Sequence, residues 1–188
     1  MIVVGIAGYK RCGKDTLCKA LTEELANLGL TAKRRALADE LKEEIAVTLH
    51  WVNPAISAEE HLRRMNCDEW KEKYRLIMQW WGTEWRRDET MAGWDSYWID
   101  KVTEWLNTAG SDIVIVPDIR FPNEAKWCGE HNGVVVWMNR PGSVTSGHAS
   151  ESALNGYKQF DVVIDNDGDY ERLQSKALWV VEKIKGLL

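Results

Sequence analysis

The segment Gly8-Tyr9-Lys10-Arg11-Cys12-Gly13-Lys14-Asp15-Thr16 has the residue types and spacing of a phosphate-binding loop. Its glycines allow backbone N–H groups to turn toward a phosphate, and the helix expected after it adds the partial positive charge of its N-terminus. Lys14 is placed to reach the β- and γ-phosphates of a nucleoside triphosphate, and Arg11 is a candidate for stabilising charge on a transferred phosphoryl group. The alternatives are a plain glycine turn and a solvated Arg11.

Asp15 stands where Ser or Thr usually follows the lysine of such a loop. A carboxylate beside a triphosphate is repelled unless a cation lies between them, so we expect Asp15 or Thr16 to meet Mg²⁺, directly or through water. The alternative is that Asp15 only complements the N-terminus of the helix.

A second group of chemically suited residues follows the apolar run Ile113–Val116. Asp118 would lie at the carboxyl end of a buried strand, the ligand-binding edge of a parallel sheet, where it could hold Mg²⁺ or its water. Arg120 could contact a phosphate. Glu124 lies near the start of the next helix, where favourable interaction with the helix dipole is the simpler explanation.

Two further segments carry weaker signals. Arg75 and Gln79 are four residues apart, so they share a helical face, and Gly82-Thr83 follow them. This face could form a wall against a nucleotide, although a solvated face is the more common arrangement. Arg140 opens a stretch of small residues that suits a lid closing over phosphates, and His148 within it indicates no chemistry by itself.

Hydrophobic periodicity supplies the elements that must position these residues. Apolar β-branched runs predict strands buried on both faces, and stripes at helical spacing predict the helices between them. The alternation implies right-handed βαβ units and an α/β fold. The predicted strands are 2–7, 31–37, 113–116, 133–138 and 161–164. The predicted helices are 14–27, 39–50, 68–87, 95–107, 123–130 and a last one ending near residue 188, with Ser57 as an N-cap and a loop over 140–152.

Composition restricts the function classes. The chain has 188 residues and a net charge of −5, which argues against a sequence-independent nucleic-acid binder but not against small phosphorylated ligands. Four cysteines without a CxxC pair indicate a reduced, cytoplasmic compartment. No stretch reaches the about 18 apolar residues of a membrane-spanning helix, so we expect no membrane partner. The sequence leaves open whether the chain forms a homodimer.

Together these motifs resemble the deoxynucleoside monophosphate kinases of the bacteriophage T-even type. The matching segments occur in the family's order and span nearly the whole chain: YKRCGKDT (9–16), ADELK (38–42), RLIMQWWGTE (75–84), SYWIDKV (96–102), VPDIRFPNEA (116–125), RPGSVTSGHASE (140–151) and VIDNDG (163–168).

The resemblance implies a P-loop NMP-kinase-like fold in a single domain: a five-stranded parallel sheet flanked by helices. The implied core is 1–37, 112–140 and 153–188, with a helical acceptor-binding insert over 38–111 and a lid over 141–152. It implies transfer of the γ-phosphoryl of ATP·Mg²⁺ to a deoxynucleoside 5′-monophosphate, in a host cytoplasm if the protein is viral.

The resemblance also assigns residues by position. The loop Lys10, Arg11, Cys12, Gly13, Lys14, Asp15 and Thr16 would bind ATP phosphates, with Asn166 and Gly168 near the adenine. The acceptor site would comprise Leu41, Lys42, Arg75, Gln79, Gly82, Thr83, Trp98, Asp118, Arg120 and Glu124. Positive charge for phosphoryl transfer would come from Lys14, Arg11, Arg75, Arg120 and Arg140, and metal contacts from Asp15, Thr16 and Asp118. The preferred base stays open.

Two alternatives remain. Another P-loop small-molecule kinase, such as dephospho-coenzyme A kinase or phosphomevalonate kinase, would share the loop. A nucleotide-binding switch without turnover is suggested by the D-x-x-G pattern of Asp165–Gly168, but the chain has no N-K-x-D motif.

The chain is also rich in tryptophan, with 11 residues, seven of them between Trp70 and Trp105. We expect most of these seven to pack in the core of the insert, because an isolated helical segment needs large apolar side chains. Trp98 is the exception that we expect to touch the nucleotide.

Overall fold

The computed structural model describes residues 1–91, 93–143 and 149–188. The chain divides into two compact units: a sheet unit of residues 1–36 and 104–188, and a helical unit of residues 37–103. Part of the predicted lid, residues 144–148 with His148, lies outside the described residues.

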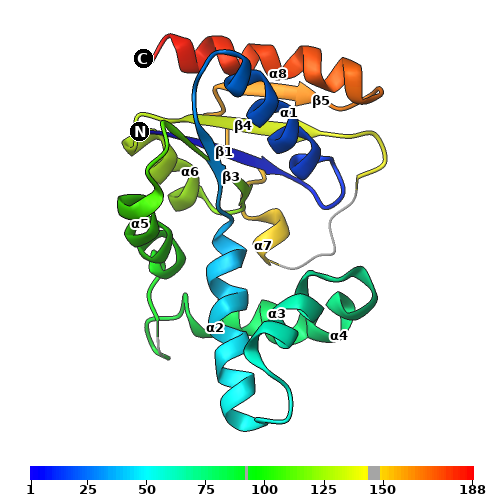
Figure 1. Cartoon of the computed structure of the whole chain (residues 1–188), viewed down its shortest axis with the longest axis vertical. Coiled ribbons are helices and arrows are strands. Elements are labelled where there is room, and N and C mark those ends of the chain that lie inside the picture. Colours follow the sequence, from blue (N-terminus) through cyan, green and yellow to red (C-terminus); the bar gives the residue numbers. More distant parts are fainter. Residues whose placement is uncertain (92, 144–148) are drawn as a thin grey trace. The chain divides into compact units, whose positions relative to one another are not determined.

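The sheet unit is built on five parallel strands, as predicted (Figure 1). The strand order is β2-β3-β1-β4-β5, which makes β1 the central strand. Strands β3, β1 and β4 are the three inner strands and have apolar side chains at almost every position. This composition is typical of parallel strands that are covered by helices on both faces. The strands are β1 (Ile2–Gly8), β2 (Ala32–Arg34), β3 (Ile113–Ile119), β4 (Val134–Asn139) and β5 (Val162–Asp165).

Strand β3 is longer than its apolar run, which predicted an end at Val116. It continues through Pro117 and Asp118 to Ile119. The pairing with β1 shifts at this point, because Gly5 faces Val116 whereas Ala7 faces Ile119, so β3 carries one extra residue. A bulge is where a central strand can accept a proline, which has no N–H to donate. The bulge therefore keeps Asp118 within the strand, at its carboxyl end.

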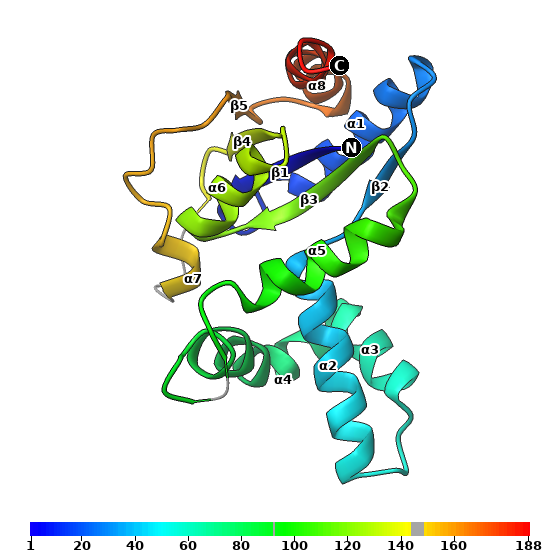
Figure 2. The ribbon, with the colours of Figure 1, turned by 90° about the vertical axis from the view of Figure 1, so that its left-hand side faces the viewer.

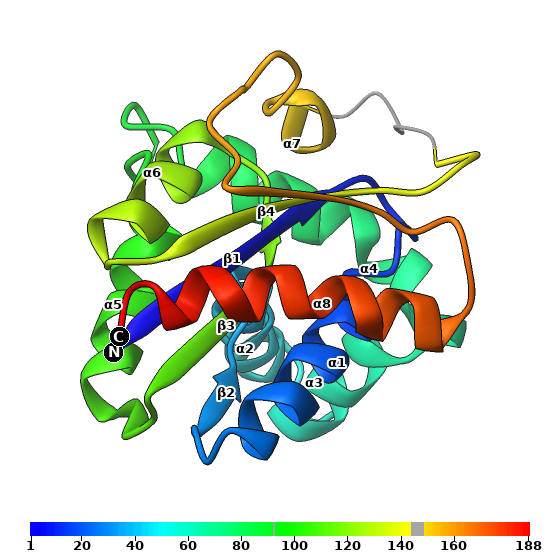
Figure 3. The same cartoon turned by 90° about the horizontal axis from the view of Figure 1, so that it is seen from above.

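Helices cover both faces of this sheet (Figures 2 and 3). Helices α1 (Lys14–Asn27) and α8 (Tyr170–Lys185) pack on one face and on each other, and their apolar stripes form the main core with the strands. Helix α6 (Pro122–Glu130) lies on the other face. A β-carbon at Gly5 would lie 2.6 Å from the Cys128 sulfur, so only glycine lets α6 approach β1 this closely.

One short helix interrupts the predicted loop. Helix α7 spans Ala149–Ser152 within the segment that we expected to be irregular. The small residues of this segment lack an apolar stripe, so periodicity did not indicate the helix.

The helical unit contains α2 (Leu37–Val52), α3 (Ala58–Asn66), α4 (Asp68–Gln79), the π-helix η1 (Trp80–Trp85) and the first part of α5 (Tyr97–Ala109). The predicted N-cap is confirmed, because the Ser57 hydroxyl accepts a hydrogen bond from the Glu60 amide at 3.2 Å. The prediction of one α-helix from Asp68 to Arg87 was wrong in its second half. The wider π turn begins at Trp80, which periodicity at 3.6 residues per turn does not distinguish.

The expectation that most tryptophans of the helical segment are buried was also wrong. Only Trp81 and Trp98 of the seven are buried, and Trp80 and Trp94 are each 46% exposed. Trp is large enough to be seldom fully buried. The rings instead contact one another or lie under cations: Trp80 stacks on Trp85 with centroids 5.4 Å apart, and the Arg86 guanidinium lies 4.6 Å from the Trp85 ring.

Within the described residues, no helix is long and apolar enough to cross a membrane.

Candidate phosphate-binding site

The phosphate loop joins the end of β1 to the start of α1, at the carboxyl edge of the central strand. Three of its residues have positive φ: Gly8 at 146°, Arg11 at 63° and Gly13 at 102°. Gly13 cannot be replaced without a clash, since an added β-carbon would lie 2.5 Å from the Asn166 amide nitrogen. This tight, left-handed loop brings the N-terminus of α1 and its partial positive charge to the site.

Lys14 lies folded against its own loop. Its ammonium donates to the carbonyl oxygens of Gly8 at 2.8 Å and Tyr9 at 2.9 Å. These contacts hold the charge inside the ring of the loop, where a bound phosphate could take the place of the carbonyls. The Lys14 ammonium therefore lies where the predicted contact with a phosphate requires it.

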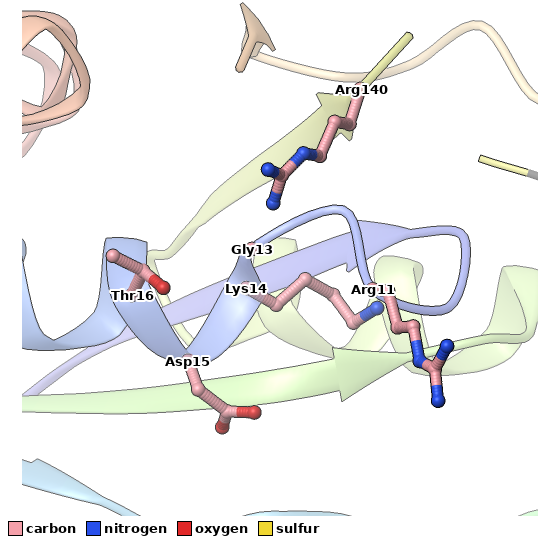
Figure 4. A pocket seen from close by; sticks show the side chains of 6 residues that line it. All are labelled: Arg11, Gly13, Lys14, Asp15, Thr16 and Arg140. Carbon is pink, nitrogen blue, oxygen red and sulfur yellow. The ribbon is translucent and has the colours of Figure 1, made fainter. Parts of the chain in front are cut away.

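A cavity of about 270 Å³ opens at this loop (Figure 4). The Lys14 side chain runs along the loop toward Arg11, and Arg140 extends toward the loop from the end of β4. Three cationic side chains and one carboxylate give the wall a net positive charge, which suits a polyanion. The lining residues are Arg11, Gly13, Lys14, Asp15, Thr16 and Arg140.

Asp15 and Thr16, the predicted metal contacts, are exposed on the first turn of α1. The Asp15 carboxylate lies 3.6 Å from the Arg34 guanidinium on β2. No cluster of three or more His, Cys, Asp and Glu side chains that could hold a metal occurs among residues 1–91, 93–143 and 149–188. The donors present nevertheless suit Mg²⁺, which usually keeps several waters and takes only one or two protein ligands beside phosphate oxygens.

Two of the other predicted donor-site residues, Asn166 and Cys12, contact each other and stabilise the loop from its buried side. The buried Asn166 amide donates to the Cys12 carbonyl oxygen at 2.9 Å, and Cys12 itself is fully buried. Burial raises the pKa of the Cys12 thiol, so Cys12 is a neutral packing residue of the loop. Gly168 lies next to Asp167, which pairs with Arg172 and Lys176 at the start of α8. Lys10 is exposed.

Asp118 lies at the carboxyl end of β3, Arg120 in the turn that follows, and Glu124 in the first turn of α6. The Arg120 guanidinium donates to the Ser150 hydroxyl at 3.2 Å, which connects this turn to α7. Glu124 is 3% exposed, and its carboxylate accepts hydrogen bonds from the Arg120 and Phe121 amides at 2.7 and 3.1 Å. Glu124 thus caps the N-terminus of α6, whereas the sequence had indicated only a favourable interaction with the helix dipole.

Two of the predicted acceptor residues in the helical unit, Arg75 and Lys42, make polar contacts with other residues of the same unit. Arg75 forms a bidentate ion pair with Glu72, in which Nε and Nη2 of the guanidinium donate to the two carboxylate oxygens at 2.6 and 2.5 Å. The Lys42 ammonium donates to the Asn66 side-chain oxygen at 2.7 Å. Gln79 ends α4, and Thr83 lies with Gly82 in the π-helix.

Trp98 is packed against the π-helix. Its ring is 4% exposed, and its indole N–H donates to the Gly82 carbonyl oxygen at 2.9 Å. A Leu41 methyl carbon lies 3.0 Å from where a β-carbon of Gly82 would be, so this part of the unit is tightly packed. The contact of Trp98 with a nucleotide stays a prediction.

The polar network around Glu44 in the helical unit was not predicted from the sequence. Glu44 of α2 accepts hydrogen bonds from the Trp81 indole at 2.9 Å, the Arg86 guanidinium at 2.6 Å and the Tyr97 hydroxyl at 2.8 Å. The signal in the sequence is weak: Glu44 directly precedes the buried Ile45 and Ala46, and its three partners lie far along the chain.

Known proteins resemble this chain over most of its length. A family model described as phosphomevalonate kinase matches residues 6–133. A protein of Acanthamoeba polyphaga mimivirus, named "Putative deoxynucleotide monophosphate kinase", is 24% identical over 192 residues that cover 97% of each chain.

Solved structures are similar as well. An unliganded sugar kinase from Janibacter sp. HTCC2649 aligns with a TM-score of 0.50 and 15% identity, over 100% of this chain and 98% of its own. A dephospho-CoA kinase from Campylobacter jejuni aligns with a TM-score of 0.46 and 15% identity, over 97% and 96%. The sugar kinase supports the predicted P-loop kinase fold. Because the family model covers more than half of the sequence and includes the phosphate loop, this chain belongs to the phosphomevalonate kinase family and is a small-molecule kinase.

Proposed function

We propose that the protein transfers the γ-phosphoryl group of ATP to deoxynucleoside 5′-monophosphates, forming the diphosphates and ADP. The observation that carries this proposal is the cationic cavity at the phosphate loop, where Lys14, Arg11 and Arg140 surround a space of about 270 Å³. Such an arrangement suits phosphoryl transfer, since the reaction needs two anions held in line and positive charge on the transferred oxygens.

The residues of this chain supply binding and charge rather than covalent chemistry. Lys14 exchanges the Gly8 and Tyr9 carbonyls for phosphate oxygens of ATP. Arg11 and Arg140 neutralise the charge on the transferred group. An oxygen of the acceptor phosphate attacks the γ-phosphorus, the bond from this phosphorus to the β–γ bridging oxygen breaks, and ADP leaves.

Magnesium would be held by Asp15, Thr16 and Asp118 together with phosphate oxygens and water. It would supply additional charge neutralisation on the phosphates.

The acceptor phosphate needs its own cations, for which Arg75 and Arg120 are the candidates. Each already donates hydrogen bonds to oxygen acceptors, Arg75 to the Glu72 carboxylate and Arg120 to the Ser150 hydroxyl. A bidentate arginine is well suited to phosphate geometry. Leu41, Lys42, Gln79, Gly82, Thr83, Trp98, Asp118 and Glu124 are the remaining proposed acceptor residues.

Two observations bear on the identity of the acceptor. The name of the mimivirus relative supports a deoxynucleoside monophosphate. The family model favours a second candidate, phosphomevalonate, which also offers a phosphate monoester as the attacking group. The first is preferred because the motif set that resembles deoxynucleoside monophosphate kinases extends to residue 168, whereas the family model ends at residue 133.

A coupled assay of ADP release decides between these acceptors. Purified protein with ATP and Mg²⁺ is offered each deoxynucleoside monophosphate, phosphomevalonate and dephospho-coenzyme A in separate reactions. We expect at least one deoxynucleoside monophosphate to stimulate ADP release far above the other two compounds. Stimulation by phosphomevalonate or dephospho-coenzyme A alone would overturn the proposal in favour of that acceptor, and stimulation by none would favour a non-catalytic nucleotide-binding module.

A further inference from the structure

Helix α7 brings a buried hydroxyl to the turn that follows β3. Ser150 of this helix is 6% exposed, and its hydroxyl oxygen accepts a hydrogen bond from Nη1 of the Arg120 guanidinium at 3.2 Å. The two residues are 30 positions apart in the chain, and both belong to the sheet unit. Arg120 is exposed, so this contact ties a long charged side chain to a buried residue.

The main chain of Arg120 is held by a different group. The Glu124 carboxylate accepts a hydrogen bond from the Arg120 amide at 2.7 Å, and the preceding residue, Ile119, is 1% exposed at the end of β3. These contacts fix where the side chain begins but do not restrict its rotatable bonds. An exposed arginine has several rotamers, and selecting one of them costs conformational entropy. The hydrogen bond to Ser150 therefore favours one direction of the guanidinium.

The partner of Arg120 is neutral, which matters for phosphate binding. A guanidinium has five N–H donors, and the contact with Ser150 needs only one of them. A hydroxyl thus orients the guanidinium without cancelling its charge. Arg75, the other candidate for the acceptor phosphate, is paired with the Glu72 carboxylate, whose negative charge opposes the approach of an anion. Arg120 is the better prepared of the two cations.

Resting on the function proposed above, we propose that Ser150 is a positioning residue for the acceptor: its hydroxyl orients the Arg120 guanidinium to bind the phosphate of the deoxynucleoside monophosphate. A side chain that is already ordered binds its ligand more tightly, because part of the entropic cost of immobilising it is met before the ligand arrives. Ser150 acts only through Arg120. Its loss should therefore weaken binding of the monophosphate and leave ATP binding and the chemical step nearly unchanged.

Steady-state kinetics of Ser150→Ala measure this effect, with the monophosphate that has the highest kcat/KM in the coupled assay as the acceptor. We expect the KM for this monophosphate to rise about fivefold, which corresponds to about 1 kcal/mol, the size of one hydrogen bond. The kcat and the KM for ATP should each change less than about twofold, the pattern expected when only binding is lost.

Two further variants support this measurement. Ser150→Cys keeps the size of the side chain but accepts hydrogen bonds only weakly, so it should also raise the KM for the monophosphate. Ser175→Ala removes a hydroxyl from α8, where it donates to the Glu171 carbonyl oxygen at 3.0 Å, and is the matched control with wild-type kinetics.

A double-mutant cycle tests whether Ser150 acts through Arg120. Arg120→Ala by itself should lower kcat/KM for the monophosphate. Adding Ser150→Ala to this variant should change kcat/KM by less than about twofold, because the guanidinium that Ser150 orients is absent. A local packing defect in α7 would instead lower kcat/KM by the same factor with and without Arg120.

The outcomes separate this assignment from the proposed function. An unchanged KM for the monophosphate in Ser150→Ala and Ser150→Cys, both shown to be folded by circular dichroism, overturns the assignment. A rise confined to the KM for ATP, or an equal effect of Ser150→Ala with and without Arg120, overturns it as well. If Ser150→Ala does not fold, Ser150→Cys takes its place in each measurement. Absence of wild-type turnover with every monophosphate would instead contradict the proposed function.

Discussion

The side-chain amide nitrogen of Asn166 donates a hydrogen bond to the backbone carbonyl oxygen of Cys12, which is 2.9 Å away and 154 residues earlier in the chain. The bond joins the turn after β5 to the middle of the phosphate loop. The same side chain occupies the space that a β-carbon on Gly13 would need. Asn166 therefore supports the loop from the core side, in addition to its proposed place near adenine.

Replacing Asn166 with alanine should weaken both the fold and ATP binding. The substitution leaves a buried carbonyl without its donor, which costs about 1–3 kcal/mol of unfolding free energy. Urea denaturation measures this loss, and initial-rate kinetics should show a raised KM for ATP. Asn107→Ala, at an exposed position of α5, serves as the control. Equal stability of Asn166→Ala and wild type would show that the bond does not hold the loop.

Replacing Lys14 with alanine should abolish most transfer and leave the fold intact. Loss of one positive group aimed at the transferred phosphate should lower kcat by at least about 10²–10³-fold. ADP release is the assay, and circular dichroism checks the fold. Lys19→Ala removes an exposed lysine one turn further along α1 and should keep wild-type activity. Retained activity in Lys14→Ala would refute the assignment of the phosphate loop.

Replacing Glu44 with glutamine should destabilise the helical unit. The variant loses the negative charge that holds Arg86 and two neutral donors in a half-buried position, at a cost of about 1–3 kcal/mol. Thermal unfolding followed by tryptophan fluorescence reports the change, since Trp81 contacts Glu44 directly. Glu89→Gln, an exposed carboxylate, should leave Tm unchanged. A Tm of Glu44→Gln equal to that of wild type would mean that the network adds nothing to stability.

The acid sensitivity of α3 should depend on Glu60. Hydrogen bonds from Arg63 and Arg64 lower the pKa of Glu60 to about 2. Because the folded state favours the ionised carboxylate, its stabilisation is complete above the ordinary pKa of about 4.5 and is lost as the pH falls toward 2.

The difference in Tm between wild type and Glu60→Gln should thus be largest above about pH 5 and shrink steadily between pH 4.5 and 2. Thermal melts over this pH series measure it, with Glu69→Gln on the exposed surface of α4 as the control. A difference that is constant across the series would contradict the proposed ion pairs.

Local patterns were sufficient for the main elements of the sheet unit. The helix predicted from Lys14 to Asn27 has those bounds in the structure, because a glycine-rich loop precedes it and its leucine stripe ends before Gly29. Strands β1, β3, β4 and β5 were indicated by β-branched runs, which are typical of sheets covered by helices, whereas β2 contains no β-branched residue. The phosphate loop was recognisable because its glycines, its lysine and its neighbouring elements all lie within 27 residues.

Other features depended on partners distant in sequence. Strand β3 extends past Val116 because pairing with β1 tolerates a bulge at Pro117, which the proline alone would argue against. The π-helix at Trp80–Trp85 coincides with contacts from Trp81 to Glu44 and from Gly82 to Trp98. Hydrophobic periodicity depends only on the spacing of apolar residues within one segment, so it does not reveal contacts between segments that are far apart in the chain.

The amino-acid sequence by itself determined where the Gly8–Thr16 loop lies and most of the strands and helices, but not the π-helix, α7 or the end of β3. These properties follow from residue types within a few positions of one another. Only the tertiary structure decided that Asn166 supports Cys12, that Glu44 gathers Trp81, Arg86 and Tyr97, and that Ser150 accepts a hydrogen bond from Arg120. The physical reason is that such contacts join residues through the strand order and the packing of helices on the sheet, which local spacing does not specify.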